Sequence, residues 1–178
     1  MDTDPKKVDI LALDLEGTLI SNIVSQSPRP HLKEFLQFCQ DSDFCTVLYT
    51  ACDTHSARDA LMRLERYGHI PRIMGMMPIV KWDKFTGSTR NPKNLQHAQK
   101  MYPGSRLHKC YLVDDISAFV AIGQQDQWIP VLPFNLPYSR DDTELLRVKS
   151  IIQAIMAGDN TVMRRGYSGD HIVVLGQQ

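Results

Sequence analysis

Acidic and hydroxyl side chains follow three short apolar runs in this sequence, at the point where each run ends. The first run ends at Asp14, and the chain continues as Asp14-Leu-Glu-Gly-Thr18. The second run ends at Thr50, and the third ends at Asp114 and Asp115. Short apolar runs without polar alternation are typical of strands buried in a parallel sheet. Ligands bind such sheets outside the carboxyl ends of the strands, so we expect these side chains to share one edge.

The chemistry that this set could perform is phosphoryl transfer. Converging carboxylates repel one another unless a cation lies among them, and oxygen-only ligands favour a hard ion such as Mg²⁺. An aspartate can attack phosphorus, while a hydroxyl and an ammonium can bind the phosphate oxygens. Asp14 and Glu16 are two residues apart, so their side chains point the same way along an extended chain. Glu16 could then protonate the leaving group and later activate water.

The elements that must position these residues alternate between strand and helix patterns. Strands are predicted at 8–13, 44–49, 110–113 and near 128–132, with one or two short edge strands within 72–81. Helices are predicted at 31–40, 57–67, 93–101, about 116–123 and 142–156. Asp53 or Thr54 can cap the second helix and Ser139 the last, and 82–90 is expected to be a polar loop. The alternation predicts an α/β fold: a three-layer sandwich with a mostly parallel sheet and helices on both faces.

Length and composition favour one domain over 1–178, with a core of about 8–157 and a C-terminal tail of 158–178, where 173–175 could add an edge strand. The 178 residues carry 20 basic and 20 acidic side chains, which argues against broad capture of nucleic acid or an anionic membrane. No run approaches the ~20 apolar residues of a membrane span, and the first residues lack a signal-peptide layout. We therefore expect a cytoplasmic chain without membrane or nucleic-acid partners; a nuclear location is also compatible.

The ordered set of strand-end residues resembles the haloacid dehalogenase-like (HAD) superfamily. Its first motif, Asp-x-Asp-x-Thr, matches 14–18, its second-motif hydroxyl matches Thr50, and its fourth-motif acids match Asp114 and Asp115. Within the superfamily the chain is most similar to the small CTD phosphatase and NLI-interacting-factor group. The supporting segments are RPHLKEFL (29–36), VLYTAC (47–52) and DTELL (142–146). The resemblance implies a Rossmann-like sheet.

The resemblance also implies a Mg²⁺-dependent phosphomonoesterase that works through an aspartyl-phosphate. Asp14 would be the nucleophile and Glu16 the general acid and base. Thr50, with Ala51 beside it, would hold phosphate oxygens. The metal would be held by Asp14, the backbone carbonyl of Glu16, Asp114 and Asp115.

The family's phosphate-binding lysine lies near a helix start, before the strand that ends in the acid pair. Lys93 fits this place because it opens the predicted helix at 93–101. Lys81 is the competitor because it follows an apolar run. Both lysines remain candidates, with Lys93 the first choice.

Glu16 stands where the family's first motif has Asp. Glu is one methylene longer, and a misplacement of ~1 Å can cost ~10²-fold in rate. The enolase-phosphatases of the same superfamily also carry Asp-x-Glu-Gly-Thr. The change therefore bears on rate and substrate more than on the presence of activity.

The spacing of the motifs leaves no room for a cap domain. The 35 residues between Asp14 and Thr50 and the 42 between Thr50 and Lys93 are already used by a loop, helices and strands. Neither gap holds a cap domain of ~70 residues. An uncapped site is open to a bulky substrate such as a phosphoprotein with a Ser, Thr or Tyr phosphate. The insert at 73–90, with Trp82 and Phe85, is expected to form a wall of the site.

Two other functions remain compatible with the sequence. One is a small-metabolite phosphatase for sugar or nucleotide phosphates, in which oligomerisation or the insert replaces the cap. The other is a binding module that kept the fold and lost turnover, and its only support in the sequence is Glu16.

Overall fold

The computed structural model of the chain describes residues 7–42, 44–103 and 106–159. The edge strand expected at 173–175 lies outside these residues. Within them, no helix is both long enough and apolar enough to cross a membrane.

A five-stranded parallel sheet forms the centre of the fold, in the order β3-β2-β1-β6-β7. The strands are β1 (Lys7–Leu13), β2 (Phe44–Thr50), β3 (Ile79–Lys81), β6 (Arg106–Asp114) and β7 (Trp128–Pro130). β1 lies between β2 and β6, with Leu13 aligned with both Leu48 and Val113. The three strands that carry the motifs are therefore neighbours. Their carboxyl ends bring Asp14, Thr50 and Asp114 to one edge, as predicted.

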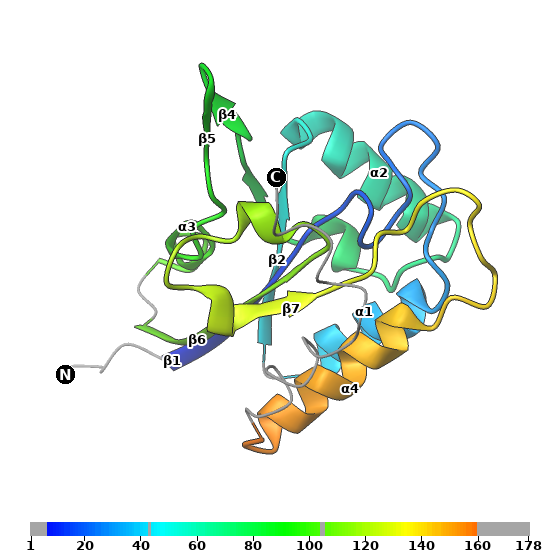
Figure 1. Cartoon of the computed structure of the whole chain (residues 1–178). Coiled ribbons are helices and arrows are strands. Elements are labelled where there is room, and N and C mark those ends of the chain that lie inside the picture. The colour runs from blue at the N-terminus through cyan, green and yellow to red at the C-terminus, as the bar shows by residue number, and fades with distance from the viewer. Residues whose placement is uncertain (1–6, 43, 104–105, 160–178) are drawn as a thin grey trace.

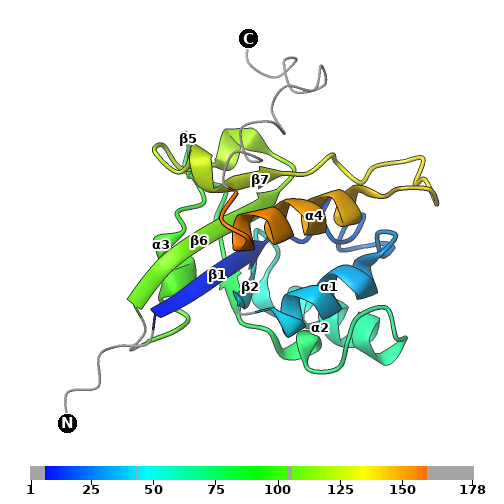
Figure 2. The same ribbon diagram turned by 90° about the horizontal axis from the view of Figure 1, so that it is seen from below.

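Helices cover the two faces of the sheet unequally (Figure 2). One face is covered by α1 (Leu32–Asp41), α2 (Thr54–Arg66) and α4 (Glu144–Met156), and the other by the short α3 (Gln96–Gln99). β1 serves both layers because alternate side chains point to opposite faces: Leu11 and Leu13 pack with the three long helices, and Ile10 and Ala12 pack with α3. The fold is the predicted α/β sandwich, and residues 7–42, 44–103 and 106–159 contain no cap domain.

The layer around α3 differs from the sequence-based prediction. The helix predicted at 93–101 is only four residues long, and Lys93 precedes it in an extended segment. The helix predicted at 116–123 is only a 3₁₀ turn at Ser117–Phe119. The reason is tertiary: Lys93 forms a bridge with Val120, and its N–H donates to the Phe119 carbonyl at 2.6 Å. The bridge holds Lys93 in an extended conformation, and the Phe119 carbonyl is used by Lys93 instead of by a following helical turn.

The segment predicted as a polar loop at 82–90 contains an antiparallel hairpin. Its strands are β4 (Phe85–Thr86) and β5 (Thr89–Arg90), and it projects from the body of the molecule (Figure 1). Gly87 takes φ 61° in the two-residue turn, a conformation that glycine adopts without a steric penalty. The side chain of Asn91 ties the base together by donating to the Asp83 carbonyl and to Thr86 Oγ1, both at 2.9 Å.

The ends of the long helices follow local capping chemistry. Asp53 caps α2 by accepting a hydrogen bond from the Ser56 N–H at 2.9 Å, as predicted. α4 begins at Glu144 rather than at Asp142, and Ser139 does not cap it. Asp142 accepts a hydrogen bond from the Glu144 N–H, and its carboxylate is also bound to Arg29. The contact with Arg29 links α4 to the turn after β1.

Candidate active site

A buried ammonium between two buried carboxylates is the centre of the site. Lys93 Nζ lies 2.6 Å from Asp14 Oδ1 and 2.5 Å from Asp114 Oδ2. β1 delivers Asp14, β6 delivers Asp114, and the extended segment before α3 delivers Lys93. The ammonium also lies 5.0 Å from the centre of the Trp82 ring. The structure thus brings together residues that are far apart in the sequence.

Burial and charge shift the pKa values of these groups strongly. Burial raises the pKa of Asp14 to about 7. The positive charge of Lys93 works to lower this pKa, but repulsion from Asp114 cancels part of that effect. Burial works to lower the pKa of Lys93, but the carboxylates of Asp14 and Asp114 outweigh it, so this pKa is raised. One ammonium does not neutralise the acids around it, and the site retains an excess of negative charge.

Asp115 adds a third carboxylate to this cluster. Oxygens of Asp14, Asp114 and Asp115 lie within 4.8 Å of one another. Asp115 Oδ1 is buried and has no hydrogen-bond partner, and burial, followed by repulsion from Asp114, raises the pKa of Asp115 to about 6. An unpartnered buried carboxylate oxygen is costly unless a cation satisfies it. The three acids are a donor set that fits a hard divalent cation such as Mg²⁺.

The turn after β1 makes room for Asp115 at Gly17. Gly17 takes φ +76°, and a Cβ at this position would lie 2.6 Å from Asp115 Oδ2. Glycine is needed here both for its backbone conformation and for the close approach of the carboxylate.

Thr50 and Ala51 line a small cavity of about 30 Å³ together with Asp14 and Lys93. Thr50 is buried at the end of β2, and its Oγ1 accepts a hydrogen bond from the Cys52 N–H at 3.1 Å. The hydroxyl hydrogen of Thr50 therefore remains available to donate to an anion in the cavity.

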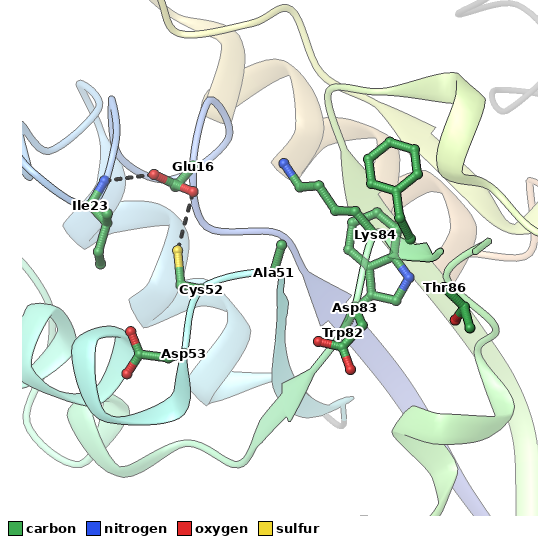
Figure 3. A pocket seen from close by; sticks show the side chains of 10 residues that line it. Glu16, Ile23, Ala51, Cys52, Asp53, Trp82, Asp83, Lys84 and Thr86 are labelled. Atoms are coloured by element: carbon green, nitrogen blue, oxygen red, sulfur yellow. Dashed lines mark hydrogen bonds between the residues drawn. The ribbon is translucent and has the colours of Figure 1, made fainter. Parts of the chain in front are cut away.

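Glu16 lines the same cavity from its rim. Its Oε1 accepts a hydrogen bond from the Ile23 N–H at 2.8 Å, and its Oε2 accepts one from the Cys52 thiol at 3.2 Å (Figure 3). Both carboxylate oxygens thus already have hydrogen-bond donors within the chain. The longer Glu side chain is held by the loop after β1 and by the turn after β2.

A groove of about 620 Å³ adjoins the small cavity (Figure 3). The two spaces share Glu16, Ala51, Trp82 and Lys84 in their linings. Trp82 and Phe85 line the groove, which confirms the predicted wall. Lys84 also lines the groove and could not be assigned to it from the sequence, because the local pattern of a polar loop does not indicate which way a lysine points.

The competing lysine, Lys81, lies on the surface. Its Nζ is 2.9 Å from Asp83 Oδ1, and its side chain is 49% exposed. Its position at the end of an apolar run predicted a place near the sheet edge, but its ammonium pairs with its own neighbour instead. Lys93, not Lys81, lies against Asp14.

Arg29 is a second residue whose role near the site could not be assigned from the sequence. Its side chain is buried, its Nε and Nη2 donate to Asp142 at 3.1 and 2.9 Å, and its Nη1 donates to the Gly17 and Thr18 carbonyls. Arg29 thus links the turn at Gly17 and Thr18 to Asp142, which lies just before α4. The sequence did contain a signal for this contact. The segments at 29–36 and 142–146 both resemble the family, and Arg29 and Asp142 join them.

Comparison with known proteins agrees with this geometry. No curated protein matches the chain significantly. Residues 9–163 match the model of the NLI interacting factor-like phosphatases, a span that contains every acid and lysine of the site. The chain therefore belongs to the NLI interacting factor-like phosphatases, the small CTD phosphatase family of the HAD superfamily, and is a hydrolase of phosphoric monoesters.

Proposed function

We propose that the chain hydrolyses phosphomonoesters through an aspartyl-phosphate on Asp14, with Mg²⁺ as its metal. The observation that carries this proposal is the contact of Lys93 with Asp14 and Asp114 beside the unpartnered oxygen of Asp115. Asp14, Asp114, Asp115 and the backbone carbonyl of Glu16 would hold the metal. When bound, Mg²⁺ supplies positive charge that offsets the repulsion between nucleophile and phosphate.

In the first step, a carboxylate oxygen of Asp14 attacks phosphorus and the bond from phosphorus to the ester oxygen breaks. Lys93 and the Thr50 hydroxyl donate hydrogen bonds to the other phosphate oxygens, whose charge they stabilise. The carboxyl group of Glu16 gives its proton to the leaving oxygen. The products are the free alcohol and a phosphorylated Asp14.

In the second step, Glu16 accepts a proton from a water molecule. The water oxygen attacks phosphorus, and the bond from phosphorus to Asp14 breaks. Inorganic phosphate leaves, Asp14 returns as a carboxylate, and Glu16 is protonated again. Asp14 and Glu16 line the same cavity, which supports this division of roles.

The substrate that we propose is a phosphorylated segment of another protein. The small cavity of about 30 Å³ marks where Asp14, Thr50 and Lys93 meet. The adjoining groove of about 620 Å³ is open and has room for residues that flank a phosphate. The groove combines the apolar surfaces of Ile23, Trp82 and Phe85 with polar groups. No cap domain closes over it in the described part of the chain.

A catalytically weak module that binds phosphate is a second candidate, and one observation favours it. Both oxygens of Glu16 are already bound, to the Ile23 N–H and to the Cys52 thiol. Proton transfer by Glu16 then requires that the Cys52 contact be broken, which would slow turnover. Measured rates separate the two candidates.

Rates of phosphate release in Mg²⁺ test the proposal. We expect Asp14→Asn to abolish release from a chromogenic phosphomonoester, because the nucleophile is lost. Asp126→Asn is the matched control, since Asp126 is exposed and precedes the amino end of β7, at the opposite edge of the sheet from Asp14. Equal rates for wild type and Asp14→Asn would refute the mechanism.

A panel of substrates tests the choice of a phosphoprotein. We expect higher kcat/KM for Ser, Thr or Tyr phosphopeptides than for nucleotide and sugar phosphates. A preference for a small metabolite would contradict this choice. Mg²⁺ binding without turnover on any phosphoester would favour the weak module.

A further inference from the structure

Lys84 stands where the small cavity meets the groove. It lines both spaces, whereas Lys93 lines only the small cavity. Its side chain extends across the groove from the Trp82 side toward the Glu16 side (Figure 3). Among the described residues, Lys84 and Lys93 are the two cationic side chains that line these spaces.

Aromatic rings support Lys84 in this position. Its Nζ lies 5.9 Å from the centre of the Phe119 ring, and Phe119 packs edge-on against Trp82, with ring centres 4.6 Å apart. The ring of Trp82 in turn lies 5.0 Å from Lys93 Nζ. The two ammonium groups therefore stand on a shared aromatic pair, and cation–π attraction favours both positions.

No carboxylate of the described residues forms an ion pair with Lys84. The positive charge of Lys84 nevertheless acts on a carboxyl group of the site. The ammonium of Lys84 works to lower the pKa of Asp115, against the larger effects of burial and of Asp114, which raise it. By contrast, Lys81 on the same segment is paired with Asp83. Lys84 thus remains available for an anion from outside the chain.

The charge of the site calls for such a cation. Asp14, Glu16, Asp114 and Asp115 face a single buried ammonium, and a divalent metal would offset only part of their charge. A phosphate monoester adds a charge of about −1.5 to −2 near neutral pH. Another positive group on the groove side would therefore favour entry of the substrate, since the ammonium of Lys93 is already paired with Asp14 and Asp114.

We propose that Lys84 is a second phosphate-binding residue, which contacts the substrate phosphate from the groove side while Lys93 contacts it from the sheet side. This inference rests on the proposed function for the identity of the anion. It makes the β4–β5 hairpin part of the binding machinery, because Lys84 immediately precedes β4.

The affinity for inorganic phosphate tests this role without requiring turnover. Isothermal titration calorimetry of the full chain in Mg²⁺ should give a Kd about tenfold higher for Lys84→Met than for wild type, the size expected for one charge-assisted hydrogen bond. Lys84→Arg keeps the charge and should retain most of the affinity. Lys100→Met is the matched control, since Lys100 is exposed and lines neither space.

Salt gives a readout that a merely structural role would not produce. Lys84 is exposed, so the difference in Kd between wild type and Lys84→Met should narrow as ionic strength rises. Unchanged affinity in Lys84→Met would overturn the inference, as would an absence of phosphate binding by wild type. Phosphate binding that depends on Lys84 in a chain that hydrolyses no phosphoester would uphold the inference and refute the proposed function.

Discussion

At Gly17, the absence of a side chain allows Asp115 to join Asp14 and Asp114. A Cβ there would approach Asp115 Oδ2 to 2.6 Å, and the backbone φ of +76° disfavours other residues as well. The acid cluster therefore depends on a residue that carries no functional group. This dependence can be separated experimentally from the cost of backbone strain.

We expect Gly17→Ala to weaken Mg²⁺ binding by about tenfold or more, because the added methyl group displaces the Asp115 carboxylate. Gly68→Ala is a matched control: Gly68 has φ +74°, and no atom lies within 4 Å of the added Cβ. Both variants carry a similar strain, but only Gly17→Ala should lose metal affinity in a calorimetric titration. An equal loss in both variants would contradict the role of Gly17.

At the scale of elements, the contact between Arg29 and Asp142 fixes the turn after β1 to the start of α4. The guanidinium is buried and makes two hydrogen bonds to the carboxylate and two to carbonyls of the turn. This turn carries Glu16 and Gly17. The contact therefore stabilises the fold and also holds in place the turn that carries Glu16.

We expect Arg29→Met to lower the free energy of unfolding by about 3 kcal/mol, because removing one partner leaves Asp142 unpaired. Arg66→Met on exposed α2 surface should change it by less than about 0.5 kcal/mol. Urea unfolding followed by circular dichroism measures both values. A loss in Arg29→Met no larger than in the control would show that the contact adds little.

At the scale of the whole molecule, the buried acids make stability depend on pH. The pKa values of Asp14 and Asp115 are raised to about 7 and about 6 from an ordinary value of 3.8. At pH values between 3.8 and these raised pKa values, the two carboxyl groups keep their protons in the folded chain but have lost them in the unfolded chain. The stability of the metal-free protein therefore falls as pH rises through this window.

We expect the Tm of the metal-free protein to be higher at pH 5 than at pH 7.5 by about 5 °C, the shift that roughly 2 kcal/mol produces in a chain of this size. Excess Mg²⁺ should reduce the difference, because metal binding favours the ionised carboxylates. Thermal melts with chelator and with Mg²⁺ measure both effects. Asp115→Asn should shrink the difference without metal, and a Tm that rises with pH in chelator would contradict this reasoning.

The sequence by itself determined which strands end in side chains that could take part in a reaction. Buried strands read as unbroken apolar runs, so the positions of Asp14, Thr50 and Asp114 at their ends could be recognised without a structure. The alternation of strands and helices also determined the layered fold, and the short intervals between the motifs left no room for a cap between them. These features are local in the chain, or follow from counting residues along it.

Only the tertiary structure decided the partners of these residues. Lys93 is extended rather than helical because it bridges to Val120, and Lys84 lines the groove with its ammonium near the ring of the distant Phe119. Arg29 with Asp142 and Glu16 with Cys52 join segments that are distant in sequence. Local patterns record what each segment favours alone, whereas such contacts arise from long-range packing, which overrides local preference where backbone and buried charges must be satisfied.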